Sequence, residues 1–195
     1  MIQISPRTRL RRHAERAVPD EACMILAQGQ VAHVGLVADG QPFVIPLTYQ
    51  YDPADPARLY LHGARASRVM QQVGDGRPVC VTVTLLDGLV YSRDAPDHSV
   101  NYRSVLVFGR GRVVTDAAEK EALFERMIAR YHPGRTAGRD YAPPAAQDLA
   151  TTTVVAVEIE EMSAKARRGG PNGPRDADSE APGTCGVVDL IRERP

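Results

Sequence analysis

The stretch LYLHGARASRVM, residues 59–70, holds the first side chains that could do chemistry. It begins with the alternation of a strand and ends with the apolar spacing of a helix, and His62 lies at the join. Ser67 precedes the apolar run, so it can cap a helix whose free amide N–H groups would face an anion. Arg68 would add a planar guanidinium suited to a phosphate, and Arg65 lies nearby in the loop. A serine in this place is often only a helix cap, so these residues alone leave both interpretations open.

His62 is the candidate for proton chemistry, because an imidazole can donate a hydrogen bond or a proton near neutral pH. The alternative is that it satisfies a backbone carbonyl at the end of a strand. His33 lies in an alternating strand and is interpreted as structural or surface, and His98 lies in a polar loop. His13 and His132 belong to no recognisable constellation.

Composition excludes several classes of protein. The 195 residues carry 24 Lys and Arg against 24 Asp and Glu, so no global field favours nucleic acid or an anionic membrane. The basic run PRTRLRRHAER near the start is interpreted as a solvated arm. No apolar run is long enough to span a membrane and no signal peptide is visible, so we expect a cytoplasmic protein.

The cysteines do not indicate a structural framework. Cys23, Cys80 and Cys185 are odd in number and never form a CxxC pair, which argues against disulfides and against a zinc site. We expect reduced thiols, with Cys80 as a buried small apolar residue between two valines. The five histidines show no metal-ligand spacing, so no metal site is expected.

The early part of the chain predicts one helix and a hairpin. The run 19–21, PDE, is typical of a helix start, and Gly29 of its end. Met24, Ile25 and Ala27 would form the apolar face between them. Two β-rich runs then flank Asp39-Gly40, a strong hairpin signal.

Further strands follow, with one long helix late in the chain. The strands are predicted in RLYLH, RPVCVTVTLLDGLVYS, VNYRSVLVFGRGRVVT and TTTVVAVEIEEMS. Gly109 and Gly111 suggest a bulge or sharp bend in the third of these. The helix lies in TDAAEKEALFERMIARYHP, where Asp116 and Glu119 are spaced like a capping box.

This order does not alternate as a doubly wound sheet would, so the predicted fold class is β-rich α+β, a six-stranded antiparallel barrel with flanking helices. The expected organisation is a basic N-terminal arm over residues 1–18, the barrel domain over 19–165, and a loop-rich tail over 166–195.

Four motifs in this order resemble one known family. VIPLTYQYD, LYLHGARASR, NYRSVLVFGRGRVV and EIEEMSAKARRG together cover most of residues 9–168. They are similar to the pyridoxamine 5′-phosphate oxidase-like superfamily of FMN-binding split barrels, nearest the branch that contains the nitroimidazole-resistance (Nim) proteins. The resemblance implies a split barrel, FMN as the cofactor, and a homodimer with each FMN between two subunits.

The resemblance also implies positions for the cofactor. The strand 44–48 would run under the isoalloxazine ring and offer backbone groups, Leu61 and His62 would lie beside the flavin, and Ser67 with Arg68 would hold its phosphate. A second strand would present Tyr102, Arg103 and Ser104 to the cofactor. The residues expected around FMN are Ile45, Pro46, Leu47, Thr48, Leu61, His62, Ser67, Arg68, Tyr102, Arg103 and Ser104, with His62 as the catalytic candidate.

The chain departs from the family pattern in three places. Val69 stands where the oxidases carry a lysine, so the phosphate site has one cation fewer, which Arg65 or Arg103 could supply. The chain has no tryptophan, and Cys185 stands where relatives often place one near the flavin. The Arg-rich C-terminal substrate motif of the oxidases is not found, which disfavours oxidation of pyridoxamine 5′-phosphate itself.

The leading hypothesis is therefore an FMN-dependent oxidoreductase acting on a small molecule. A flavin-binding or carrier protein without turnover, and an F420-dependent reductase on the same fold, are the alternatives. Haem also binds to split barrels, but the His62 motif fits the flavin relatives better. The residues do not specify the substrate.

Overall fold

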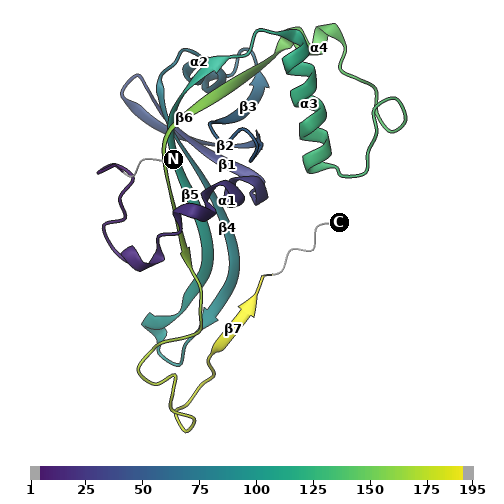
Figure 1. Ribbon diagram of the computed structural model, residues 1–195. Helices are drawn as coiled ribbons and strands as arrows, with labels where there is room; N and C mark the ends of the chain where they lie inside the picture. The colour runs from purple at the N-terminus through teal and green to yellow at the C-terminus, as the bar shows by residue number, and fades with distance from the viewer. Residues whose placement is uncertain (1–4, 191–195) are drawn as a thin grey trace.

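The computed structural model describes residues 5–190, and their strands form one antiparallel sheet (Figure 1). The strands follow the order β1-β2-β3-β6-β5-β4-β7, and β1 also pairs with β4. Their bounds are β1 (Val31–Ala38), β2 (Gln41–Tyr51), β3 (Arg58–Ala64), β4 (Pro78–Tyr91), β5 (Ser99–Val113), β6 (Thr152–Arg167) and β7 (Gly186–Asp189). The extra β1–β4 pairing closes six strands into a ring, which confirms the predicted antiparallel split barrel.

Two short helices contribute to the core of the barrel. The helices are α1 (Ala22–Gln28), α2 (Arg68–Gly74), α3 (Ala117–Tyr131) and α4 (Ala146–Thr151), with single 3₁₀ turns at Ala14–Arg16, Pro19–Glu21 and Ala95–Asp97. Ile25 and Leu26 of α1, and Met70 and Val73 of α2, are almost completely buried in the same core as the inward-facing valines of β4. None of the helices in the described residues is long and apolar enough to cross a membrane.

The predicted hairpin between β1 and β2 is confirmed. Its two central residues, Asp39 and Gly40, have φ values of 53° and 76°. Positive φ at both positions is the signature of a type I′ turn, whose twist matches that of the flanking strands. The turn fixes the register that places Val31 opposite Thr48 and His33 opposite Pro46.

The pairing of β5 is irregular at Gly109, one of the two glycines predicted to mark a bulge or bend. The β5–β6 register shifts between Phe108 and Gly109, and the extra residue, Glu160, belongs to β6. A Cβ atom on Gly109 would lie 2.2 Å from the Glu158 carbonyl oxygen, and one on Gly111 would lie 2.5 Å from the Val73 carbonyl oxygen. Only glycine allows β6 and α2 to approach β5 this closely.

α3 covers the outer face of β3 and β6. Asp116 accepts a hydrogen bond from the Glu119 N–H, so the predicted N-terminal cap is confirmed. Leu123 is buried in a small outer cluster with Val114, Val154 and Ala156. On this side α3 thus forms a second layer over the sheet.

The C-terminal end of α3 is held by backbone carbonyls of the barrel. The Arg130 guanidinium donates to the carbonyls of Tyr51, Leu26 and Gly29, at 3.3, 3.0 and 2.5 Å. The Tyr131 hydroxyl accepts from the Tyr49 N–H at 3.1 Å. These contacts join α3 to both β2 and the turn after α1.

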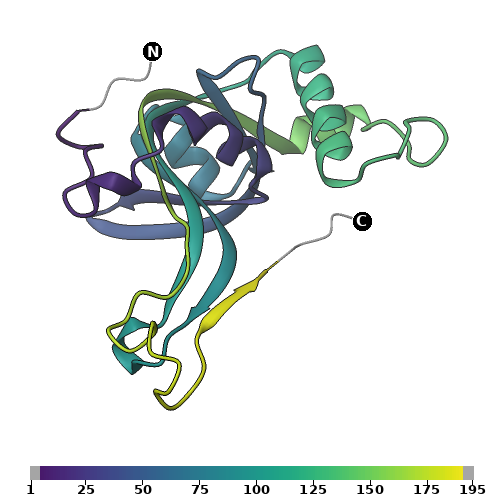
Figure 2. The same ribbon diagram turned by 60° about the horizontal axis from the view of Figure 1, so that its bottom comes forward.

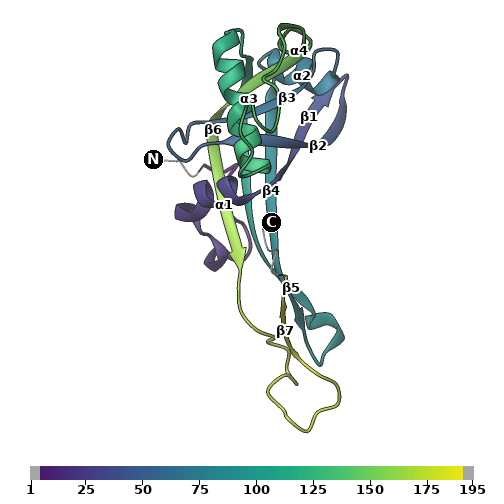
Figure 3. The same cartoon turned by 90° about the vertical axis from the view of Figure 1, so that its right-hand side faces the viewer.

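β4 and β5 extend far beyond the barrel as an arm, which projects from it in the side view (Figure 3) and toward the viewer in Figure 2. We define the arm as residues 87–103 together with residues 168–189. β7 pairs with β4 there, through Gly88–Tyr91. The segment 166–195 was predicted to be loop, but β6 continues to Arg167 and Gly186–Asp189 forms β7. Four residues flanked by glycines and polar residues give too short a pattern to be recognised as a strand.

Three smaller predictions need correction. α1 buries Ala22, Ile25 and Leu26, whereas Met24 is half exposed, because the helix starts only after the 3₁₀ turn. Cys80 points to the outer face and is only partly buried, since its neighbours Val79 and Val81 take the inner face. The predicted arm over 1–18 is not wholly solvated, because Thr8 is buried against the barrel.

We predict that Arg130→Met destabilises the fold by roughly 2–4 kcal/mol, because three partly buried carbonyls lose a charged donor at once. Arg126→Met, on the exposed side of the same helix, is the matched control and should change stability by about 0.5 kcal/mol or less. Urea unfolding followed by circular dichroism measures both. Equal effects of the two substitutions would contradict the clamp.

Candidate functional site

The residues singled out on β2, on β3 and at the start of α2 meet at an open corner of the barrel. β3 pairs with β2 only through Tyr49–Tyr51, so over residues 41–48 the described structure places β1 on one side of β2 and no strand on the other. We call this region, with His62–Arg68 at the end of β3 and the start of α2, the corner. Its strand edge leaves backbone N–H and C=O groups free for a ligand, and Pro46, which lacks an N–H, lies within it.

Ser67 occupies the N-cap position of α2 with extended backbone, but its side chain makes no capping hydrogen bond. The loop before it is held by the backbone, since the Ser67 N–H donates to Ala64 O at 2.8 Å and the Arg65 N–H donates to Thr151 O at 3.1 Å. Ser67 therefore takes the predicted N-cap position, but its hydroxyl does not make the hydrogen bond of a cap. Its hydroxyl remains able to bind another group.

Two arginines of the corner carry uncompensated charge. The Arg68 guanidinium carbon lies 4.7 Å from the centroid of the Phe43 ring, a cation–π contact that orients it over the start of β2. Within residues 5–190, neither Arg65 nor Arg68 forms an ion pair with an acidic side chain. Both side chains are exposed, so an anionic ligand could reach them.

His62 lies on the outer face at the end of β3. Its ring meets the Phe124 ring edge-on, with centroids 6.0 Å apart. Burial lowers the pKa of the imidazole below its usual value, so the neutral form prevails at neutral pH. Its Nδ1 is shielded from solvent and has no hydrogen-bond partner among the described residues. An unpaired buried nitrogen is costly, which makes His62 a candidate contact for a bound group.

The side chains of the expected β2 and β3 residues divide between the two faces. Ile45 and Leu47 pack toward the core and Leu61 is completely buried, so these three can offer a ligand only backbone groups. Pro46 and Thr48 are exposed on the outer face. Extending the Tyr49–Leu61 register by one residue places Thr48 beside His62.

The structure does not bring Tyr102, Arg103 and Ser104 to the corner of the same chain. His62 lies on β3 and Ser104 lies on β5, and along the outer face β2, β1 and β4 lie between these two strands. The path from His62 to Ser104 over that face therefore spans four strand spacings, or about 19 Å. The Tyr102 ring instead lies 5.5 Å from the Lys165 ammonium group.

Arg103 is engaged elsewhere. It donates to both carboxylate oxygens of Asp87, at 2.9 and 2.7 Å, and to the Gln28 side-chain oxygen at 2.5 Å. The hydrogen bond with Asp87 raises the pKa of the guanidinium further. Arg103 is therefore a strut between the arm and α1, and of the two arginines considered for the missing cation only Arg65 is near Arg68.

A cavity of about 970 Å³ lies where the arm leaves the barrel. Its walls come from the stretch between the end of α1 and the start of β1, the middle of β4, Arg103 of β5, and the end of the C-terminal strand. The lining residues are Gln28, Gln30, Val31, His33, Thr84, Leu85, Leu86, Asp87, Arg103, Asp189 and Leu190. Sequence reasoning singled out only Arg103 and His33 among them, and no local pattern could have shown that four separate segments converge here. Val31 pairs with Thr48, so the cavity adjoins the outer face of the corner.

The family model described as pyridoxamine 5′-phosphate oxidase matches residues 19–166. The chain belongs to the pyridoxamine 5′-phosphate oxidase-like family. The match covers the whole barrel, including the corner. No sequence among the curated proteins matches the chain.

Solved structures of the same fold include two with substantial sequence identity. The flavocytochrome Anf3 from Azotobacter vinelandii is 31% identical, with a TM-score of 0.82, over 98% of this chain and 87% of that protein. An FAD- and haem-binding protein from Mycobacterium smegmatis is 29% identical, with a TM-score of 0.79, over 92% of this chain and 87% of the other. A Bacteroides thetaiotaomicron protein provisionally described as a 5-nitroimidazole antibiotic resistance protein is 22% identical, with a TM-score of 0.60, over 77% of this chain and 86% of that protein, and shows the shared fold.

Proposed function

We propose that the protein binds a flavin nucleotide at the corner and uses it in oxidation or reduction of a small molecule. The observation that carries this proposal is the 31% identity to a flavocytochrome over nearly the whole chain. The corner supports it with two unpaired arginines, an uncapped serine hydroxyl and an open strand edge. A flavin phosphate would accept from Arg68 and Ser67, and the backbone edge of β2 would face the ring system.

The flavin would supply the electron chemistry, and the chain's own residues would bind and orient it. Thr48 and Pro46 are exposed on the outer face of β2, and neutral His62 can donate or accept one hydrogen bond at the edge of that face. A cytoplasmic location, expected from the sequence, belongs to the same proposal.

FAD is a stronger candidate than the FMN expected from the sequence. The M. smegmatis protein is described as binding FAD, and the corner holds Arg65 in addition to Arg68. A pyrophosphate presents more negative oxygens than a single phosphate, and two guanidinium groups three residues apart match that demand better than one. Arg65 would then supply the second cation of the phosphate site, because Arg103 is already paired with Asp87.

We predict that Arg68→Ala weakens flavin binding by about 1.5–3 kcal/mol, the scale of a charge-assisted hydrogen bond. Arg77→Ala, an exposed arginine just beyond α2, is the matched control and should bind flavin like the parent protein. Fluorescence titration with FAD and with FMN measures both affinities and identifies the preferred nucleotide. Unchanged binding in Arg68→Ala would remove the phosphate from the corner.

Haem is a second candidate cofactor, although the sequence motif around His62 favoured a flavin over haem. Both solved structures with about 30% identity are described as containing it. The neutral, half-buried His62 with its unpaired nitrogen has the chemistry of an axial ligand. In this arrangement His62 would bind iron rather than contact the flavin.

We predict that His62→Ala abolishes the Soret band of protein incubated with haemin while flavin absorption persists. His33→Ala, the other histidine on the outer face of the barrel, is the control and should retain both bands. A Soret band that survives His62→Ala would show that another residue binds the iron. Loss of flavin alone would make His62 a flavin-positioning residue instead.

We propose in addition that two copies pair through the outer face of β1 and β2. Val31, Val37 and Val44 are 41%, 58% and 64% exposed there, an apolar surface beside the corner. Such pairing would let a partner supply groups to the flavin that the corner lacks. Sedimentation should show a dimer that Val44→Lys converts to monomer, whereas Val113→Lys at the far end of β5 should remain dimeric. A monomeric parent protein would refute the pairing without affecting flavin binding.

A further inference from the structure

The N-terminal segment crosses β6 as an arch held at both ends. At one end Ser5 and Arg7 bind the Glu161 carboxylate, and the Arg7 guanidinium carbon lies 4.5 Å from the Phe108 ring centroid. At the other end the Val18 N–H donates to Ala164 O at 3.0 Å. We call residues 8–17, which lie between these attachments, the arch.

The arch is longer than the gap it spans. Glu161 and Ala164 are three residues apart on β6, a separation of about 10 Å, whereas ten residues could extend over about 33 Å. The excess length is taken up by a turn at His13, which has a left-handed backbone with φ 55° and ψ 54°. The chain therefore bows away from the strand and leaves space beneath it.

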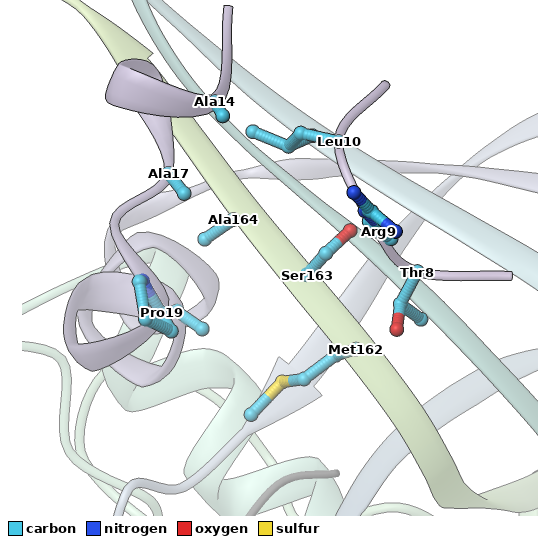
Figure 4. A pocket seen from close by; sticks show the side chains of 10 residues that line it. Thr8, Arg9, Leu10, Ala14, Ala17, Pro19, Met162, Ser163 and Ala164 are labelled. Atoms are coloured by element: carbon cyan, nitrogen blue, oxygen red, sulfur yellow. The ribbon is translucent and has the colours of Figure 1, made fainter. Parts of the chain in front are cut away.

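This space is a cavity of about 180 Å³ with mostly apolar walls. In Figure 4 the side chains of Leu10 and Arg9 lie on one side of a segment of β6, and those of Ala17 and Pro19 lie on the other. The lining residues are Thr8, Arg9, Leu10, Ala14, Ala17, Pro19, Ala22, Met162, Ser163 and Ala164. The small side chains of the walls leave the space open, and the size is close to that of an apolar cavity of about 150 Å³ known to bind benzene.

A second, more open cavity of about 520 Å³ adjoins the first and shares Arg9 with it. It is lined by Ser5, Pro6, Arg9 and Arg11, so two guanidinium groups and no carboxylate face it. Neither Arg9 nor Arg11 forms an ion pair within the described part of the chain. The apolar cavity thus adjoins a second cavity that two arginines line.

We propose that the arch binds a small carboxylate with an aromatic or short alkyl body. The body would fill the apolar cavity against Met162 and Ala164, and the carboxylate would pair with Arg9, which lines both cavities. An apolar body without charge would leave Arg9 unused, and an anion without a body would leave the cavity empty. None of the lining residues belongs to the corner or to the large cavity beside the arm, so this site is independent of the flavin proposal.

The test uses the full chain with methyl-¹³C methionine, whose Met162 signal reports on the cavity directly. The probes are benzoate, toluene, which lacks the charge, and acetate, which lacks the body. We expect saturable shifts of Met162 with benzoate, weaker binding of toluene, and no shift with acetate. A Met162 signal that stays unchanged with benzoate would overturn the proposal.

Two pairs of variants separate the body from the charge. Ala17→Leu fills the cavity from the exposed arch and should abolish binding of both benzoate and toluene, whereas Ala54→Leu, on a remote loop, should not. Arg9→Gln should weaken benzoate about fivefold to tenfold and leave toluene unchanged, whereas Arg12→Gln, which lines neither cavity, should change neither. Equal loss in Arg9→Gln and Arg12→Gln would show general attraction to a basic segment and would refute the site.

Discussion

The hydrogen bonds between β1 and β4 are the constraint on which the rest of this structure depends. They pair Ala32–Gly35 with Cys80–Val83 and turn an open sheet into a ring. Once the ring is closed, one face of every strand must be apolar and buried, and the other is left for helices or ligands. Within residues 5–190, the long edge that remains in the ring is that of β2 over residues 41–48, because β3 meets β2 at one end alone. The candidate flavin site is this remaining edge.

The two helices nearest that edge have different tasks. α2 closes the barrel with Met70 and Val73, and its first residue directs a guanidinium over Phe43. α3 stays outside, where Phe124 reaches the His62 ring and Arg130 fixes the far end of the helix to carbonyls. Phe124 of α3 packs against the His62 ring, and burial lowers the pKa of that imidazole, so the helix that shields the barrel also favours the neutral form of the candidate histidine.

Much of the fold could be predicted from the sequence because its signals are local. Asp39-Gly40 specifies its turn, Asp116 its helix cap, and the alternating valines of β4 their face. The position of Ser67 and Arg68 at the start of a helix that follows a strand was predictable for the same reason. The pairing of Arg103 with Asp87 could not be predicted, because it depends on a bulge in β4 between Leu86 and Gly88. The large cavity could not be predicted either, because its walls are assembled from segments far apart in the chain.

That bulge in β4 also reverses the parity of the hairpin. Before it, the odd-numbered Val81 and Val83 are buried, and after it the even-numbered Val90 is buried, because Asp87 is the one residue without a register partner between Leu86 and Gly88. Odd-numbered residues of β4 therefore face the core in the barrel, whereas even-numbered residues take the buried side in the arm. Deletion of Asp87 would bring the barrel and the arm into phase, would turn the buried side of the arm outward, and would remove the carboxylate that pairs with Arg103. One residue of β4 thus sets which side of the arm is buried, separately from the strands that hold the corner.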